Sequence, residues 1–106
     1  MHPAVPVTVL AATAAVVEWV EHDAESRRRW LTGCVERHAS GDWGDLDPDD
    51  CRLNDLAAAR HDERVLSRYQ LPPGHTNDAP DDAVWIITDD LGDTESPTTI
   101  LWPSDY

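Results

Sequence analysis

The chain has 106 residues, of which 41% are hydrophobic, and a formal net charge of −13 at pH 7. A length of this order suits one domain, so the sequence predicts a single acidic domain over residues 1–106. The charge disfavours direct binding to nucleic acid and to anionic membranes, because both are themselves negative. It favours cations and basic protein surfaces as partners.

The acidic charge is concentrated in the second part of the chain. Residues 1–41 carry five acidic residues and four arginines, a net charge of −1. Residues 42–106 carry sixteen acidic residues and four arginines, a net charge of −12. The second part is therefore where we expect a partner with a basic surface to bind.

Hydropathy and cysteine content indicate a cytoplasmic protein. No apolar run approaches the ~20 residues of a membrane span, and no Arg or Lys precedes Arg27, as one would in a secretory signal. Cys34 and Cys51 are too few for a tetrahedral zinc site. A disulfide between them is one alternative, but we expect two free thiols in a reducing compartment.

The first elements in chain order are an extended segment and two helices. Residues 5–9 alternate valine with Pro6 and Thr8, which predicts a short strand that Pro6 confines to a sheet edge. Thr13 is the expected N-cap of a helix over 14–22, and Asp23 that of a helix over 24–38. The arginines at 27–29 are interpreted as a solvated turn that pairs with the excess acid.

The segment from Asp47 to Asp50 is the clearest local signal in the chain. Asp47 can cap a helix, Pro48 suits its first position, and the two aspartates that follow suit the positive end of the helix dipole. The third helix is expected to reach about His61. Its predicted buried residues are Cys51, Leu53 or Leu56, and Ala57.

Three strands are expected after the helices, over residues 64–71, 83–88 and 98–102, with 83–88 apolar on both faces and therefore central. Acidic loops at 72–82 and 89–97 separate them. The predicted fold class is α+β, with two to three N-terminal helices followed by a three-stranded antiparallel meander and the N-terminal edge strand.

Several strings of residues resemble those of one protein family. They are Ser40–Leu46 (SGDWGDL) followed by Asn54-Asp55, Leu66-Ser67-x-Tyr69, Trp85–Thr88 (WIIT), and Thr98–Tyr106 (TTILxPxxY). In this order they resemble a family of small bacterial proteins associated with plasmids, phages and other mobile elements, from about Ala12 to the last residue. No activity is established for that family, so the resemblance implies a genetic context and no chemistry.

His38 and the aspartates from Asp42 to Asp50 form the densest group of candidate metal ligands or catalytic residues. The spacing of Asp45, Asp47 and Asp49 is similar to the start of a calcium loop, but position six is Asp50 instead of glycine and position twelve is Leu56 instead of glutamate. We therefore assign no metal ligand, catalytic residue or cofactor. A small metal-dependent enzyme or metal-binding protein that uses this group, with His38 as base, remains an alternative.

Trp43 lies in the middle of the SGDWGDL string and has two interpretations. It could be an exposed anchor for a partner, because tryptophan is enriched in interface hot spots. It could instead fill the gap between helices and sheet, with the flanking glycines allowing a tight path.

The leading functional hypothesis is an acidic interaction module or inhibitor. In this hypothesis the protein mimics nucleic acid and occupies the basic groove of a host defence nuclease, as an anti-CRISPR or anti-restriction protein would. Its predicted acidic face comprises Asp42, Asp45, Asp49, Asp50, Asp78, Asp81, Asp82, Asp89, Asp90, Asp93 and Glu95. A third alternative is salt adaptation with no partner site, since Asp far exceeds Glu and arginine replaces every lysine.

Overall fold

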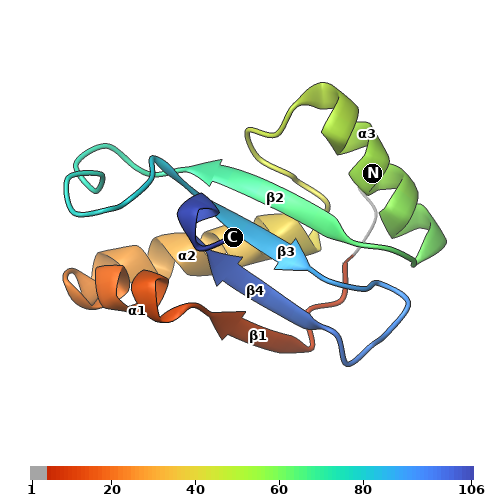
Figure 1. Ribbon diagram of the computed structural model, residues 1–106, viewed down its shortest axis with the longest axis horizontal. Helices are drawn as coiled ribbons and strands as arrows, with labels where there is room; N and C mark the ends of the chain where they lie inside the picture. The colour runs from red at the N-terminus through yellow and green to blue at the C-terminus, as the bar shows by residue number, and fades with distance from the viewer. Residues whose placement is uncertain (1–4) are drawn as a thin grey trace.

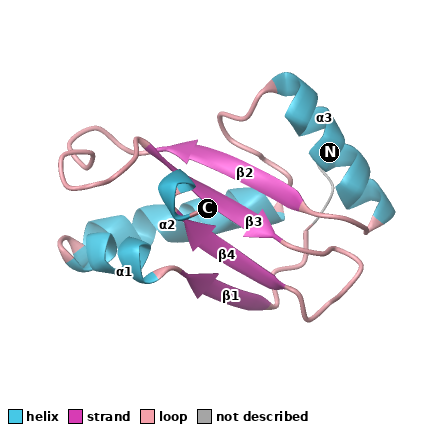
Figure 2. Cartoon of the chain, in the orientation of Figure 1, coloured by secondary structure: helices cyan, strands magenta, loops and turns pink. Residues whose placement is uncertain are grey.

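A mixed sheet and three α-helices form the part of the chain that the computed structural model describes, residues 5–106 (Figures 1 and 2). In chain order the elements are β1 (Val9–Ala12), α1 (Ala14–Glu21), α2 (Ala24–Ala39), α3 (Pro48–Arg60), β2 (Val65–Gln70), β3 (Ala83–Thr88), β4 (Pro97–Leu101) and the short 3₁₀ helix η1 (Pro103–Asp105). Helix α2 lies behind the sheet, and α3 lies beside β2 (Figure 1). The α+β class is confirmed.

The sheet differs from the predicted three-stranded meander. Its strand order is β1-β4-β3-β2. The pairs β2–β3 and β3–β4 are antiparallel, but β1 joins the free side of β4 in parallel, which makes a four-stranded mixed sheet. The meander prediction was incomplete because β1 and β4 are far apart in the sequence, and local patterns carry no information on such a pairing.

The N-terminal strand lies at a sheet edge, as expected, but over different residues. It covers Val9–Ala12, and the register pairs Val9 with Pro97 and Ala12 with Ile100. Val5, which the alternation placed in the strand, is instead buried, and its backbone nitrogen donates to the Ala39 carbonyl at 2.8 Å. The Leu-Ala-Ala part of β1 has weak strand preference, so tertiary pairing determines its conformation.

The three helices have the predicted positions, but only one has the predicted cap. Asp47 accepts a hydrogen bond from the Asp49 nitrogen at 2.8 Å. Neither Thr13 nor Asp23 makes a side-chain cap hydrogen bond within the described chain. The Thr13 hydroxyl instead donates to Asp105 at 2.8 Å, which links the start of α1 to η1.

Replacing Asp47 with alanine is expected to lower the free energy of unfolding by about 1 kcal/mol, because the first turn of α3 loses its cap. Urea unfolding of the two proteins measures the difference. Asp47→Asn is the matched control, since asparagine caps about as well as aspartate. Equal stability of all three proteins would show that the hydrogen bond to Asp49 does not stabilise the helix.

Two groups of buried residues hold the fold together. The larger lies between the sheet and helices α1 and α2 and includes Trp19 and Trp102, whose rings meet edge to face at 5.4 Å. The smaller lies under α3 and comprises Val5, Trp43, Ala57, Ala58, Val65 and Leu91. Tryptophan thus fills much of the volume that phenylalanine, absent from the sequence, occupies in other cores.

The buried face of helix α3 matches the predicted one at Ala57, which is buried, and at Cys51, which is partly buried, but not at the leucines. Asn54, Ala57 and Ala58 are buried, whereas Leu53 and Leu56 are 64% and 50% exposed. The Asn54 amide donates to the Leu66 carbonyl at 2.7 Å and accepts from the Leu66 nitrogen at 3.4 Å. A side-chain amide therefore joins α3 to β2, and the leucines are left at the surface.

Candidate functional site

His38, the predicted base, lies in a chain of buried polar side chains. Its Nδ1 is 2.6 Å from the Ser67 hydroxyl and its Nε2 is 2.9 Å from the Thr88 hydroxyl, which in turn is 2.7 Å from that of Thr98. His38, Ser67 and Thr98 are 0% exposed. Local sequence patterns do not indicate this network, because its members come from α2 and three strands.

The environment of His38 suits a structural role. Burial lowers the pKa of His38 from 6.5 to about 4, so the ring is neutral at pH 7. Both ring nitrogens are occupied by hydroxyl groups. A Ser–His pair at hydrogen-bond distance is one element of nucleophilic catalysis, but here neither side chain is accessible to a substrate.

The aspartates from 42 to 50 do not converge on His38 to form a metal site. Across residues 5–106, no three His, Cys, Asp or Glu side chains are grouped so as to hold a metal ion. Asp42 pairs with Arg37 at 2.8 Å, and Asp45 accepts from the Gln70 nitrogen at 2.9 Å. These aspartates hold their own loop against α2 and β2.

Trp43 is a core residue, so its interpretation as an exposed anchor does not hold. It is 4% exposed, and its indole nitrogen donates to Asp55 at 2.8 Å. Its ring meets His38 edge to face at 5.8 Å. The alternative interpretation, a tryptophan that fills the gap between helices and sheet, matches the structure.

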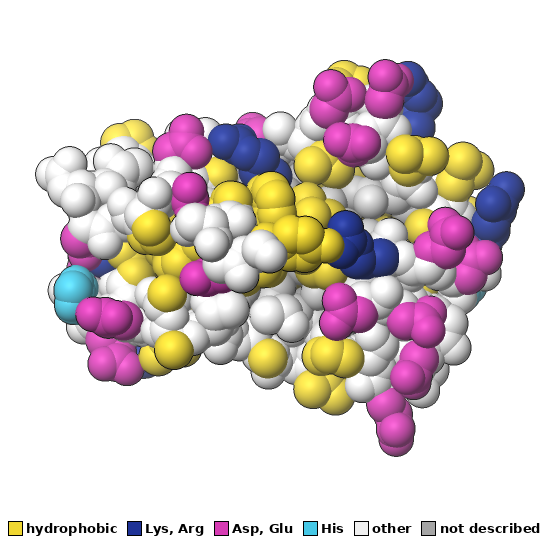
Figure 3. All heavy atoms as spheres, in the orientation of Figure 1, with side chains coloured by type: hydrophobic (Ala, Val, Ile, Leu, Met, Phe, Trp, Pro, Cys, Tyr) yellow, Lys and Arg dark blue, Asp and Glu magenta, His cyan; other side chains and the backbone are white. Residues whose placement is uncertain are grey.

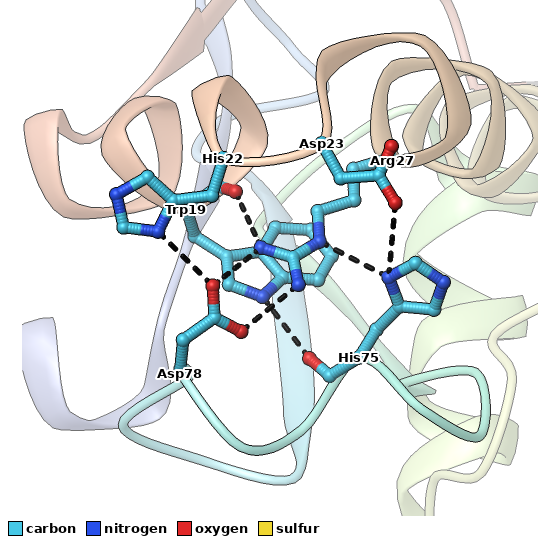
Figure 4. A network of polar contacts seen from close by, with 6 residues as sticks. All are labelled: Trp19, His22, Asp23, Arg27, His75 and Asp78. Carbon is cyan, nitrogen blue, oxygen red and sulfur yellow. Dashed lines mark hydrogen bonds and ion pairs between the residues drawn. The ribbon is translucent and has the colours of Figure 1, made fainter.

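Arg27 is buried, which corrects the interpretation of residues 27–29 as a solvated turn at this residue, whereas Arg28 and Arg29 are exposed as expected (Figure 4). Its guanidinium binds both oxygens of Asp78, at 2.7 and 2.9 Å, and lies 4.3 Å from the centre of the Trp19 ring. It also donates to the Trp19 carbonyl at 2.6 Å and to Nδ1 of His75 at 3.1 Å. Hydrogen bonds from Arg27 are the main reason that the pKa of Asp78 lies well below its usual range.

The loop between β2 and β3, residues 71–82, is held in place by its own acids. Asp78 binds Arg27, as described above. Asp81 accepts from the nitrogen and the hydroxyl of Ser104, at 3.1 and 2.7 Å, and Asp82 pairs with Arg68 at 3.3 Å. Three residues of the predicted acidic face therefore have structural partners, which local sequence patterns did not indicate.

The loop between β3 and β4 forms an acidic end of the molecule together with residues 61–64. The Leu91 nitrogen donates to the Glu63 carbonyl at 2.8 Å, which holds the two segments together. Figure 3 shows acidic side chains gathered at the right of the view, where Figure 1 places these segments. We call this surface the acidic end; its carboxylates are Asp62, Glu63, Asp89, Asp90, Asp93 and Glu95.

The residues of the predicted acidic face thus do not lie on one surface. In a meander, successive connections lie at opposite ends of the sheet, so residues 71–82 and the acidic end are separated by the length of the strands (Figure 1). Asp49 and Asp50 lie in the first turn of α3. Asp62 and Glu63, which the sequence analysis did not select, join the acidic end through a contact between distant segments.

Carboxylates of the acidic end differ in how they are held. Asp90 accepts from the Gly92 nitrogen and Asp93 from the Glu95 nitrogen, each at 2.9 Å, so both fix turns of their loop. Within residues 5–106, the side chains of Asp62, Asp89 and Glu95 make no hydrogen bond or ion pair. The acidic end therefore presents unpaired negative charge on an ordered loop.

A groove with a mixed polar and apolar lining lies next to the acidic end, between α3 and β2. It has a volume of about 420 Å³ and includes the exposed Leu53 and Leu56 together with Leu46 and Leu66, and Arg60 and Arg64 also line it. Glu63 belongs both to the groove and to the acidic end. Exposed leucines therefore lie beside charged side chains of both signs, and protein interfaces also combine apolar and polar residues.

Both cysteines are free thiols, as expected. Burial raises the pKa of Cys34 to about 12, so this thiol is protonated and unreactive at neutral pH. Burial and nearby aspartates also raise the pKa of Cys51. Cys34 therefore does not add a nucleophile to the surface.

Comparisons with known proteins found no match to this chain among family models, curated proteins or solved structures. Among the helices described between residues 5 and 106, none has the length and apolar character needed to cross a bilayer. The surface of the molecule is therefore the basis for inferring a function.

Proposed function

We propose that the protein is an acidic binding protein that occupies the basic surface of a nucleic-acid-binding protein, as an inhibitor that mimics nucleic acid. The observation that carries the proposal is the acidic end, where unpaired carboxylates on an ordered loop lie beside a groove that exposes Leu53 and Leu56. A defence nuclease in the cytoplasm is the kind of target that the resemblance to proteins of mobile elements suggests.

The charge distribution supports a basic partner. Residues 42–106 carry the net charge of −12, and they include both the acidic end and the groove. Opposite charges speed the encounter of two proteins and suppress binding to wrong partners. A groove that binds phosphates offers such a basic surface.

The groove supplies apolar contact area, which can add affinity that exposed charges alone do not provide. Exposed ion pairs contribute little to stability because water and salt screen them. Burying Leu53 and Leu56 against a partner would add affinity that does not depend on salt. We therefore place the centre of the interface at the leucines and its border at the acidic end.

The enzyme and metal-protein alternatives have less support. His38, their proposed base, is 0% exposed and already bonded to Ser67 and Thr88. Salt adaptation differs in its consequences, because it requires no partner and predicts that the fold loosens at low salt, where self-repulsion is unscreened.

Charge reversal in the acidic end is expected to weaken partner binding and leave the fold intact. The variant is Asp89→Lys with Glu95→Lys, because both residues are exposed and neither side chain has a partner among residues 5–106. Affinity capture from a host lysate at two salt concentrations, with mass spectrometry, should recover a basic nucleic-acid-binding protein with the wild type. The charge-reversed variant should recover this partner in an amount lower by about tenfold or more.

Glu18→Lys with Glu21→Lys is the matched control. It changes the net charge by the same amount on α1, away from the acidic end, at residues that are also exposed. The control should capture the same partner as the wild type. Equal loss in both variants would show that only total charge matters, and recovery of chaperones alone would contradict the proposed function.

A further inference from the structure

The outer edge of β1 has no strand beside it within the described chain. In the order β1-β4-β3-β2, β1 pairs with β4 alone. The opposite edge is covered, because Gly44 bridges to Arg68 and the Asp45 nitrogen donates to the Arg68 carbonyl at 2.7 Å. All four residues of β1 are exposed. An edge strand of this kind can pair with another chain.

An apolar groove runs beside this edge, between β1 and α2. Its volume is about 250 Å³, and its apolar lining is Leu10, Val20, Leu31, Val35 and Ile100. Leu10 is 53% exposed although it lies in the middle of the strand. A strand of four residues offers few hydrogen bonds, so the groove would provide most of the contact to a partner.

The exposed side of α2 along this groove is complementary in charge to the same surface of a second copy. Arg28, Thr32 and Glu36 are spaced four residues apart, so they form one stripe, and all three line the groove. The side chains of Arg28 and Glu36 form no ion pair with residues 5–106. A two-fold axis at Thr32 would place Arg28 of each copy opposite Glu36 of the other, which is the complementarity that a symmetric dimer requires.

The net charge also favours a second copy at this position. The groove is formed mainly by residues 1–41, whose net charge is −1, whereas the remaining charge of −12 belongs to residues 42–106. Two copies that meet through this side keep their acidic ends apart. A basic partner would be attracted to the acidic end in preference to this nearly neutral side.

We propose that the protein forms a two-fold dimer in which the β1 strands pair antiparallel and the α2 helices lie antiparallel across the joined grooves. One axis can serve both contacts, because Leu10 at the centre of β1 lines the same groove as Thr32 at the centre of the stripe. The dimer would carry two acidic ends. This inference goes beyond the proposed function and does not depend on it.

Sedimentation equilibrium of the purified full chain tests the dimer without any partner. The expected result is a species of twice the chain mass of 11.8 kDa. Leu10→Asp should weaken the dimer by about tenfold or more, because it places a charge in the joined groove. The fold should persist, since Leu10 is half-exposed in the monomer. A monomer at all concentrations up to millimolar would overturn the proposal.

Charge exchange along α2 tests the arrangement of the two copies. Arg28→Glu and Glu36→Arg should each weaken the dimer, because each places like charges opposite each other, and the double variant should restore it. Arg29→Glu is the control, because Arg29 is outside the stripe and pairs with Glu25 at 3.3 Å. A double variant as weak as the single ones, or a dimer insensitive to all of these changes, would overturn the proposal.

Discussion

Replacing Gly44 with alanine is expected to lower the free energy of unfolding by about 3 kcal/mol or more. Gly44 has a φ of +73°, a region that costs an L-residue about 1–2 kcal/mol. A Cβ there would lie 2.1 Å from the Arg68 carbonyl oxygen and 2.7 Å from the Tyr69 ring, so backbone must move. The loop between α2 and α3 would then move away from β2, and the β2 edge of the sheet would no longer be covered.

Gly74→Ala separates the effect of space from that of backbone conformation. Gly74 has a φ of +86°, but nothing lies within 4 Å of an added Cβ. We expect this control to lose only about 1 kcal/mol. Urea unfolding of both variants gives the comparison. Equal losses would contradict the tight contact between Gly44 and β2.

Stability is expected to fall by about 3 kcal/mol between pH 6.5 and pH 4 because of His38 alone. Burial lowers the pKa of the folded-state imidazole from 6.5 to about 4. In this range the unfolded chain binds a proton at His38 and the folded chain does not, so acid favours unfolding. Above pH 6.5 the ring is neutral in both states, and this contribution to stability is fully present.

His38→Gln is the matched variant, since glutamine can both donate and accept hydrogen bonds but does not titrate in this range. The difference in stability between wild type and variant should shrink as the pH falls from 6.5 to 4, and an NMR titration should place the pKa of His38 near 4. A measured pKa near 6.5 would contradict the buried network with Ser67 and Thr88.

Elements with strong local signals could be predicted from the sequence. Asp47 and Pro48 determined the start of α3, and the structure shows the expected cap. Alternation correctly placed Val65, Ser67 and Tyr69 on the buried side of β2. These signals depend on a few neighbouring residues, so no tertiary information was needed.

Features that depend on distant contacts could not be predicted. Strand β1 exists through its pairing with β4, and Arg27 is buried because Asp78 meets it from a loop about fifty residues away. The acidic end forms because residues 61–64 contact the β3–β4 loop. Hydrophobic periodicity indicates which residues prefer burial, but it does not indicate which segments meet.

The structure also divides the acidic residues by role. Asp42, Asp45, Asp78, Asp81 and Asp82 accept hydrogen bonds or pair with arginines that hold loops in place. Asp89 and Glu95 have no such partner within the described residues. The proposed partner-binding role therefore concerns the acidic end, and the high acidic content is explained in part by loop structure.

Displacement of nucleic acid tests the proposed function most directly. The captured partner, bound to a fluorescent nucleic acid, is titrated with the wild type and with the Asp89→Lys, Glu95→Lys variant, and the anisotropy of the label is followed. We predict that the wild type releases the nucleic acid, that the variant needs about tenfold more protein, and that added salt weakens both. Simultaneous binding of the nucleic acid and the wild-type protein to the partner would contradict the mimicry.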